Sequence, residues 1–328
     1  MILYFGLIEI ILIAIDVNYS DTPLLIQNVV KYNNHGGVIR FKKDQTQFWV
    51  PVRSFENTTP LKKPKGVKRI AALGDSCTQG CADANQWTWA HSYAYPGFLQ
   101  DLLRTKMKDP GIEVLNASVG SYSSFQGLKR LEHVVLKYNP DLLTIYFGWN
   151  DHWLAAQEDK NIPSLSGFQV FLLNIMEKFR FFQFMHYLID RMTHNTLEDS
   201  LRKKSAPEMR VGRPDYKKNL NAMIDLAQDR RIQVILITAP HDLKNWEPSP
   251  FFPFPRETLL EVHRAYNDVV RTTAKRRGVY LLDLERIVER QHSDKLISRD
   301  GIHLTSEGCR FIAEALAQKI LDEKILSQ

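Results

Sequence analysis

From about residue 69 to its end, the chain alternates short apolar runs with amphipathic stretches. Near-continuous apolar runs are typical of strands buried on both faces of a sheet, and here they cover 69–73, 113–116, 142–147, 233–238 and 279–283. Helical spacing of apolar residues covers 96–108, 125–138, 215–230, 256–277 and 306–323. The alternation predicts an α/β domain over 67–328, with a parallel sheet between helices and a ligand site beyond the carboxyl ends of its strands.

Two stretches depart from this alternation. Residues 36–55 have β-rich segments around the polar turn KKDQTQ, which predicts a small hairpin within an N-terminal extension over 21–66. Residues 153–211 include FQVFLLNIMEKFRFFQFMHYLIDRM, which is rich in Phe, Leu and Met. We expect a helical insertion there, either a lid over the site or a pair of packing helices.

Residues 1–20 begin with a run of mostly apolar residues, interrupted by Glu9. The run is shorter than the roughly 20 residues that cross a bilayer, and it lacks the basic start and cleavage site of a signal peptide. No Lys or Arg precedes Lys31, so the charge pattern does not support translocation. A short or tilted membrane anchor, a degenerate signal sequence and an apolar helix packed on the protein all fit. We favour the anchor, and with it a membrane-associated or extracytoplasmic location over a cytoplasmic one.

Composition narrows the class of protein only modestly. The 328 residues are 44% hydrophobic and 24% charged, which suits a globular protein with a sizeable core that needs no disulfide or metal for stability. The net charge of +6 is not gathered in one element, and no nucleic-acid-binding module is present, so we expect no nucleic-acid partner. Cys77, Cys81 and Cys309 do not form a disulfide framework, and we expect small buried thiols.

Four segments at the ends of predicted elements carry candidate chemistry. In GDSCTQG, Ser76 directly follows the first strand, and a helix beginning there would direct its free N–H groups toward the serine. The small residues of NASVGSYSS, at 116–124, allow backbone amides to approach a ligand closely. In YFGWND, Asn150 either binds an oxyanion or closes an Asx turn.

The fourth segment, RDGIHLTSEG, places Asp300 three residues before His303. This spacing can bring a carboxylate onto the imidazole and so orient a general base; in isolation it would indicate only a capped turn. Motifs of other chemistries are absent from the sequence: a phosphate loop, GxGxxG after a strand, a zinc-binding HExxH helix and a GxSxG elbow.

Taken together and in this order, the four segments resemble the SGNH (GDSL-type) hydrolase family over roughly residues 67–323. The resemblance implies a three-layer, flavodoxin-like SGNH-hydrolase fold. It also implies a serine esterase or lipase-type enzyme that cleaves carboxylic esters through an acyl-enzyme, without cofactor or metal. Ser76 would be the nucleophile, His303 the general base and acid, and Asp300 its orienting carboxylate.

By the same resemblance, the Ser76 amide, a backbone amide of the second segment and the Asn150 side chain would form the oxyanion hole. This sequence departs from the family there, because aligning NAS puts the usual glycine at Ser121, with Gly120 one place early. A left-handed φ would penalise a serine, and both residues remain candidates.

Four further residues are candidates for supporting the site or lining its pocket: Asp75, Trp149, Asp151 and Trp153. The resemblance implies a small-molecule, lipid or glycan ester as substrate, and the sequence leaves its acyl and alcohol parts open. Two alternatives remain: an O-acetyltransferase that acts on glycans with the same site, and a non-catalytic scaffold that retains the fold.

Overall fold

A computed structural model describes most of the chain. The described residues are 2–14, 32–34, 37–39, 41–43, 49–51, 55–80, 94–155, 157–161, 168, 171–172, 175, 179–182, 184–185, 208–249 and 252–327. They belong to two compact units, Met1–Val52 with Asn161–Pro207, and Arg53–Lys160 with Glu208–Gln328. The second and larger unit contains every residue to which the sequence assigns chemistry.

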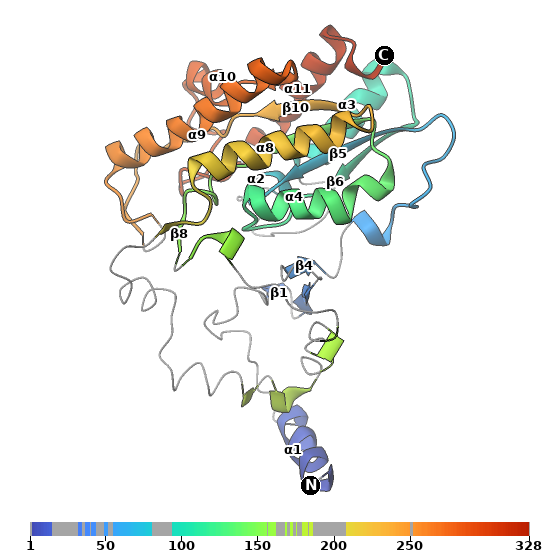
Figure 1. Cartoon of the computed structure of the whole chain (residues 1–328), viewed down its shortest axis with the longest axis vertical. Helices are drawn as coiled ribbons and strands as arrows, with labels where there is room; N and C mark the ends of the chain where they lie inside the picture. Colours follow the sequence, from blue (N-terminus) through green and yellow to red (C-terminus); the bar gives the residue numbers. More distant parts are fainter. Residues whose placement is uncertain are drawn as a thin grey trace. The chain divides into compact units, whose positions relative to one another are not determined.

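The larger unit is built on a five-stranded parallel sheet (Figure 1). Its strands are β5 (Lys68–Gly74), β6 (Ile112–Asn116), β7 (Leu142–Tyr146), β10 (Gln233–Ile237) and β11 (Tyr280–Leu282). They lie in the order β11-β10-β7-β5-β6, and each neighbouring pair is parallel. Numbered along the chain, this is the 2-1-3-4-5 order of flavodoxin-like sheets, whose ligands bind at the switch point between the first and third strands. All five predicted strands are confirmed, and so is the α/β fold class.

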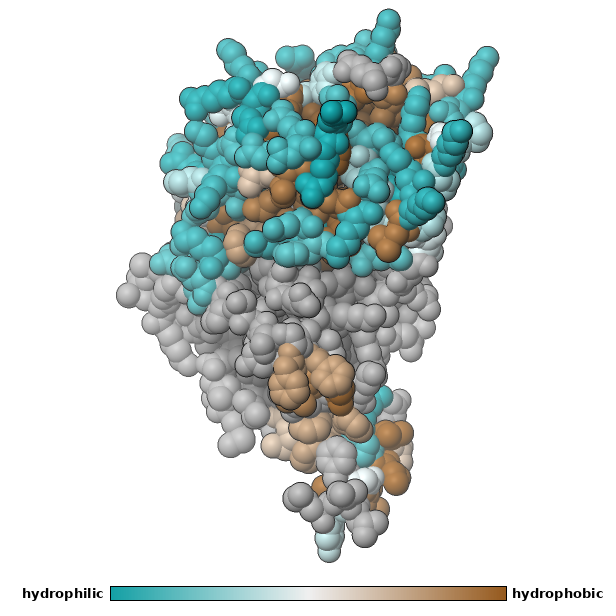
Figure 2. Space-filling model, turned by 45° about the vertical axis from the view of Figure 1, so that its right-hand side comes forward, coloured by the Kyte–Doolittle hydropathy of each residue, from teal (hydrophilic) through white to brown (hydrophobic). Residues whose placement is uncertain are grey.

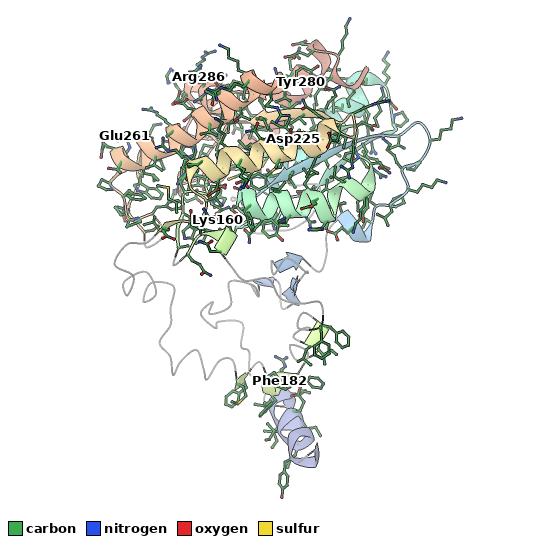
Figure 3. The ribbon with its side chains drawn as sticks, viewed as in Figure 1. Lys160, Phe182, Asp225, Glu261, Tyr280 and Arg286 are labelled. Carbon is green, nitrogen blue, oxygen red and sulfur yellow. The ribbon has the colours of Figure 1, made fainter. Side chains whose placement is uncertain are left out.

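Helices cover both faces of this sheet and make the fold three-layered. Helix α3 (Tyr95–Met107) packs against α11 (Ser306–Asp322). In front of the sheet in Figure 1, α8 (Arg213–Gln228) packs between α4 (Ser124–His133) and α9 (Arg256–Arg277). Figure 3 shows that the outer sides of these helices carry charged groups such as Asp225 and Glu261. The strands supply much of the buried core.

The helices differ from the sequence-based expectation in two places. The predicted helix over 125–138 breaks at Val134, whose φ of −122° and ψ of −64° are not helical, and a 3-10 turn, η5 (Val135–Tyr138), follows. Val134 is the first of two adjacent β-branched residues, which are weak helix formers because their side chains crowd the preceding turn. Two short helices were not predicted, α2 (Ser76–Gln79) and α10 (Leu284–Gln291).

The two ends of the predicted insertion belong to the larger unit. Strand β8 (Leu154–Ala155) pairs antiparallel with β9 (Glu208–Met209), so residues more than fifty positions apart are hydrogen-bonded together. A 3-10 turn, η6 (Asp159–Asn161), follows β8. Two more 3-10 turns in this unit are η2 (Phe55–Asn57) and η7 (Ile325–Ser327).

The smaller unit contains helix α1 (Ile2–Ala14) and two short antiparallel strand pairs. Strand β1 (Tyr32–Asn34) pairs with β2 (Gly37–Ile39), and β3 (Phe41–Lys43), which includes the two lysines of KKDQTQ, pairs with β4 (Trp49–Pro51). None of the helices in the described part of the chain combines the length and apolar character needed to span a membrane.

The structure explains why the apolar helix α1 contains one acidic residue, Glu9. Its carboxylate accepts hydrogen bonds from the backbone N–H groups of Arg180 and Phe181, at 2.6 and 2.8 Å. Other side chains of α1, among them Leu7 and Ile10, are exposed, and Figure 2 shows brown, apolar side chains on this helix. The acid therefore ties α1 to the segment around residue 180, within the same unit.

Candidate active site

Ser76 lies at the carboxyl end of β5, in a tight turn from strand to helix. Gly74 ends the strand, and a Cβ there would lie 2.1 Å from Thr78 Oγ1, so only glycine permits this close approach. The Asp75 carboxylate then caps α2 by accepting the Cys77 N–H at 2.9 Å. Because Ser76 is the first residue of the helix, its N–H has no intrahelical acceptor.

The structure joins Ser76 to the Asp300–His303 segment, 227 positions away along the chain. Ser76 Oγ is 2.9 Å from His303 Nε2. On the other side of the imidazole, Nδ1 is 2.6 Å from Asp300 Oδ2. A hydroxyl, an imidazole and a carboxylate thus form one continuous hydrogen-bonded chain, the arrangement that activates a serine.

The loop that carries the histidine depends on Gly301. This residue has a φ of +75°, and a Cβ on it would lie 2.7 Å from the Asp242 carbonyl oxygen. The Asp242 N–H also donates to the Gly301 carbonyl at 3.0 Å. Both the backbone conformation and the close contact therefore require glycine between Asp300 and His303.

Local hydrogen bonds stabilise the charged form of Asp300. Its partial burial opposes ionisation, but the His303 ring, the His303 backbone N–H and the Ser298 hydroxyl all donate to it. Together they hold the pKa of Asp300 below its ordinary value. Asp75 is shifted the other way: burial raises its pKa to about 6, although the Cys77 amide and the charge of His303 partly offset this. Asp300 is therefore ionised at neutral pH beside the imidazole.

The second segment brings a tight turn to the same edge of the sheet. Ser121 has a φ of +63°, in the left-handed region, and in the described part of the chain its N–H donates to no acceptor. Gly120 lies close to another side chain: a Cβ there would lie 2.6 Å from Gln79 Oε1, so a larger residue would require that side chain to move. The left-handed position that the alignment assigns to a glycine is thus occupied by Ser121 in this chain.

Asn150 follows β7, next to β5 in the sheet, and is 7% exposed. Its Nδ2 donates to the Tyr122 carbonyl at 3.1 Å, which links the third segment to the second. A side-chain amide carries two N–H donors, so this bond orients Asn150 and leaves one donor available. Ser76, Ser121 and Asn150 therefore each offer an N–H group in the segments that flank the switch point.

The carboxylate of Asp151 is buried behind Asn150. Its Oδ1 accepts hydrogen bonds from the backbone N–H and the hydroxyl of Ser124, at 2.9 and 2.5 Å. Burial raises the pKa of Asp151 to about 8, against the opposing effect of those two bonds. Asp151 thus holds the start of α4 against the end of β7.

The two tryptophans occupy different environments. Trp149 is 2% exposed, and its ring stacks on the imidazole of His263 at a centroid distance of 3.9 Å. Its Nε1 donates to the Pro240 carbonyl at 3.3 Å. Trp153 is partly buried, with the Arg210 guanidinium carbon 5.5 Å from its ring centroid. Trp149 is therefore part of the core beneath the site.

Sequence reasoning did not identify Arg210, which connects several of these segments. The guanidinium donates to the Ser121 carbonyl at 2.8 Å, to Gln126 Oε1 at 2.7 Å and to both carboxylate oxygens of Asp159. No motif surrounds Arg210 in the sequence. Its partners are 51 to 89 positions away, so only the fold identifies it.

Two of the three cysteines lie among the described residues. Cys77 and Cys309 are buried, which confirms the expectation of small buried thiols for these two residues. Cys81 lies outside the described residues.

The larger unit is thus a three-layer α/β fold on a flavodoxin-like parallel sheet, with a serine, a histidine and a carboxylate hydrogen-bonded together. The chain belongs to the GDSL-like Lipase/Acylhydrolase family, whose model matches residues 72–311. It is accordingly a carboxylic ester hydrolase.

Two solved structures are similar to this chain at low sequence identity. A lipase/acylhydrolase from Enterococcus faecalis is 20% identical, with 77% of this chain and 95% of that chain covered and a TM-score of 0.49. A catalytic mutant of an acetylxylan esterase from Geobacillus stearothermophilus is 16% identical, with 79% and 96% covered and a TM-score of 0.50. A search of curated proteins returned no match.

Proposed function

We propose that the chain hydrolyses carboxylic esters through an acyl-enzyme on Ser76, with His303 as general base and acid and Asp300 as its orienting carboxylate. The observation that carries the proposal is the hydrogen-bonded chain from Ser76 Oγ through His303 to Asp300. The residues come from opposite ends of the domain sequence and meet where a flavodoxin-like sheet binds its ligand.

The reaction follows from these positions. His303 Nε2 accepts the Ser76 proton as Oγ attacks the ester carbonyl, and ionised Asp300 stabilises the imidazolium. The Ser76 N–H, the Ser121 N–H and the free N–H of Asn150 donate to the oxyanion, with Gly120 supporting the turn. The imidazolium then protonates the departing alcohol. Water that transfers its proton to His303 attacks the acyl-enzyme, and the acid leaves as Oγ is reprotonated.

Substitution of the two central residues tests this mechanism. Ser76→Ala and His303→Ala are each expected to lower kcat/KM for p-nitrophenyl acetate by at least about 10³-fold, because the nucleophile or its base is lost. Ser293→Ala, in the loop after α10, and His133→Ala, exposed on α4, are matched controls that should keep wild-type turnover. Near wild-type activity in folded Ser76→Ala would refute the mechanism.

Labelling with a serine-directed fluorophosphonate distinguishes an enzyme from a scaffold. Wild-type protein should be labelled at Ser76, and Ser76→Ala should not. If the wild-type protein resists labelling while its circular dichroism spectrum is that of a folded α/β protein, the non-catalytic scaffold is the better description.

The acyl acceptor and the substrate class need a separate measurement. We propose a small-molecule or glycan ester as substrate, with a lipid ester as the competing class, and a profile of p-nitrophenyl esters of increasing chain length separates them. Adding xylo-oligosaccharides during turnover shows whether the acyl group passes to water or to a sugar hydroxyl. Transfer to the sugar would favour the O-acetyltransferase. Membrane association through residues 1–20 stays a prediction, which flotation of the full chain with liposomes tests.

A further inference from the structure

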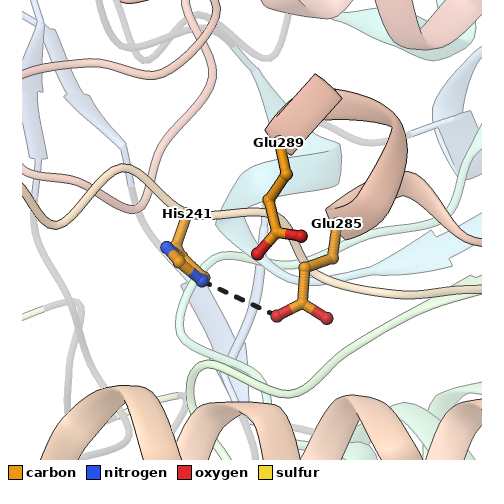
Figure 4. A group of neighbouring side chains, drawn as sticks. All are labelled: His241, Glu285 and Glu289. Carbon is orange, nitrogen blue, oxygen red and sulfur yellow. Dashed lines mark ion pairs between the residues drawn. The ribbon is translucent and has the colours of Figure 1, made fainter. Parts of the chain in front are cut away.

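Three side chains that the proposed reaction does not use converge beside the sheet (Figure 4). His241 follows β10, whereas Glu285 and Glu289 lie one turn apart on α10. One ligand atom from each of the three lies within 4.8 Å of the others. The cluster thus offers one imidazole nitrogen and two carboxylates from two separate elements.

Two of the converging atoms are buried without hydrogen bonds. The side chains of His241 and Glu285 are 10% and 3% exposed. In the described part of the chain, His241 Nε2 and Glu285 Oε1 have no hydrogen-bond partner, and they face each other at 3.6 Å, the ion pair dashed in Figure 4. A buried polar atom without a hydrogen bond is costly, and a bound ion is one explanation for such an atom.

The separation of these two atoms suits a common cation. Zinc binds histidine nitrogen and carboxylate oxygen at about 2.0–2.2 Å, so two tetrahedral ligands are roughly 3.4 Å apart. The observed 3.6 Å needs only a small adjustment. One imidazole with two carboxylates favours a transition metal such as zinc over calcium or magnesium, which prefer oxygen ligands alone.

Neighbouring charges leave Glu285 Oε1 available. The other oxygen, Oε2, accepts a hydrogen bond from Arg271 at 2.5 Å, and the same guanidinium also bonds Asp283 and Asp268. Hydrogen bonds to the far side of a ligating carboxylate are usual at metal sites. The Arg271 guanidinium thus holds one carboxylate oxygen of Glu285 and leaves the other facing His241.

The third ligand is the most adaptable. Glu289 is exposed, and among the described residues its one ion pair is a loose one, at 3.8 Å, with Arg264 on α9. Its side chain can turn toward His241 and Glu285 without loss of a buried contact.

We propose that His241, Glu285 and Glu289 bind a divalent transition-metal ion, with zinc as the best match and water completing the coordination. The ion would tie the loop after β10 to α10. Asp242, the next residue in that loop, contacts Gly301, so the metal site lies one residue from a contact of the histidine loop. The inference concerns metal binding alone and does not depend on ester hydrolysis.

Metal binding to the full chain tests the proposal directly. After treatment with EDTA and removal of the chelator, Co²⁺ titration should produce visible d–d absorption that saturates at one ion per chain, and Zn²⁺ should displace it. Either metal should raise Tm, because an ion that binds only the folded state stabilises it.

Variants identify the ligands. Glu289→Gln and His241→Asn should each weaken Co²⁺ and Zn²⁺ binding by at least about tenfold, since even the loss of a residue that supports a ligand costs about 10–100-fold. Glu314→Gln on α11 and His133→Asn on α4, both exposed, are matched controls that should bind as wild type. Because Glu289 is exposed, its variant should fold even if the His241 variant does not.

Absence of saturable 1:1 binding in the wild type, or unchanged affinity in Glu289→Gln, would overturn the proposal. Ser76→Ala should bind the metal normally, so the metal site and the proposed esterase mechanism can fail independently.

Discussion

Of the residues proposed for the reaction, Ser121 has the least favourable backbone conformation. A non-glycine residue in the left-handed region costs roughly 1–2 kcal/mol, and the φ of Ser121 is +63°. Its carbonyl is held by Arg210 at 2.8 Å, while its N–H stays available as a proposed oxyanion donor. Because the proposed contribution is made by the backbone, the serine side chain itself is dispensable.

Replacement by glycine tests this point. Ser121→Gly should keep kcat/KM for p-nitrophenyl acetate within about twofold and raise the free energy of unfolding by up to about 1 kcal/mol, since relief of strain exceeds the added chain entropy. Ser121→Val should lower both, because a β-branched residue tolerates this conformation poorly. A large loss of activity in folded Ser121→Gly would show that the hydroxyl has a role.

At the level of elements, the paired ends of the predicted insertion hold this turn in place. Arg210 directly follows β9, and its N–H donates to the Trp153 carbonyl just before β8. Its guanidinium forms a buried ion pair with Asp159 in η6, which also accepts the Ser123 hydroxyl. The β8–β9 pair thus positions a guanidinium that contacts the Ser121 turn directly.

Arg210 is therefore expected to act as a positioning residue. Arg210→Lys should lower kcat by about 10- to 100-fold with little change in KM, because lysine cannot bond the Ser121 carbonyl and Asp159 together, and small displacements of catalytic groups are costly. Arg213→Lys, exposed at the start of α8, is the matched control. A variant with lower Tm but unchanged kcat at 25 °C would assign Arg210 a purely structural role.

For the whole molecule, buried ionisable groups make stability depend on pH in two opposite directions. Burial raises the pKa of Asp151 to about 8, far above the value of about 3.9 in an unfolded chain. The contribution of Asp151 to the free energy of unfolding is fully present at low pH and is lost as pH rises toward 8. Burial lowers the pKa of His263 to about 4, so its contribution is present above about 6.5 and is lost as pH falls.

Asp151→Asn isolates the first effect. The wild-type protein should lose stability relative to this variant as pH rises from 5 to 8.5, because asparagine has no charge to bury, and each unit of pKa shift corresponds to about 1.4 kcal/mol. Urea unfolding at pH 5, 7 and 8.5 measures the difference in free energy. A difference that stays constant across this range would mean that Asp151 does not titrate as described.

Much of the architecture was predictable from sequence because the determining signals are local. A strand buried on both faces must be apolar throughout, so the five strands are visible as runs. Ser76 and Asn150 could be placed near the ends of strands, and His303 just before the last predicted helix. The order of the four segments then indicated the family. Helix α10 was not predicted because its eight residues make too few turns to show a clear helical periodicity of apolar residues. The expectation of a buried thiol at Cys81 is untested, because Cys81 lies outside the described residues.

The sequence by itself determined the fold class, the family and the residues proposed for the reaction, since burial periodicity and strand-end motifs are encoded within a few neighbouring positions. Only the tertiary structure decided that Ser121 takes the left-handed position, that Arg210 contacts its carbonyl, and that His241 faces Glu285 and Glu289. These relations join residues tens of positions apart. They depend on how the strands and helices pack, and no local pattern specifies that packing.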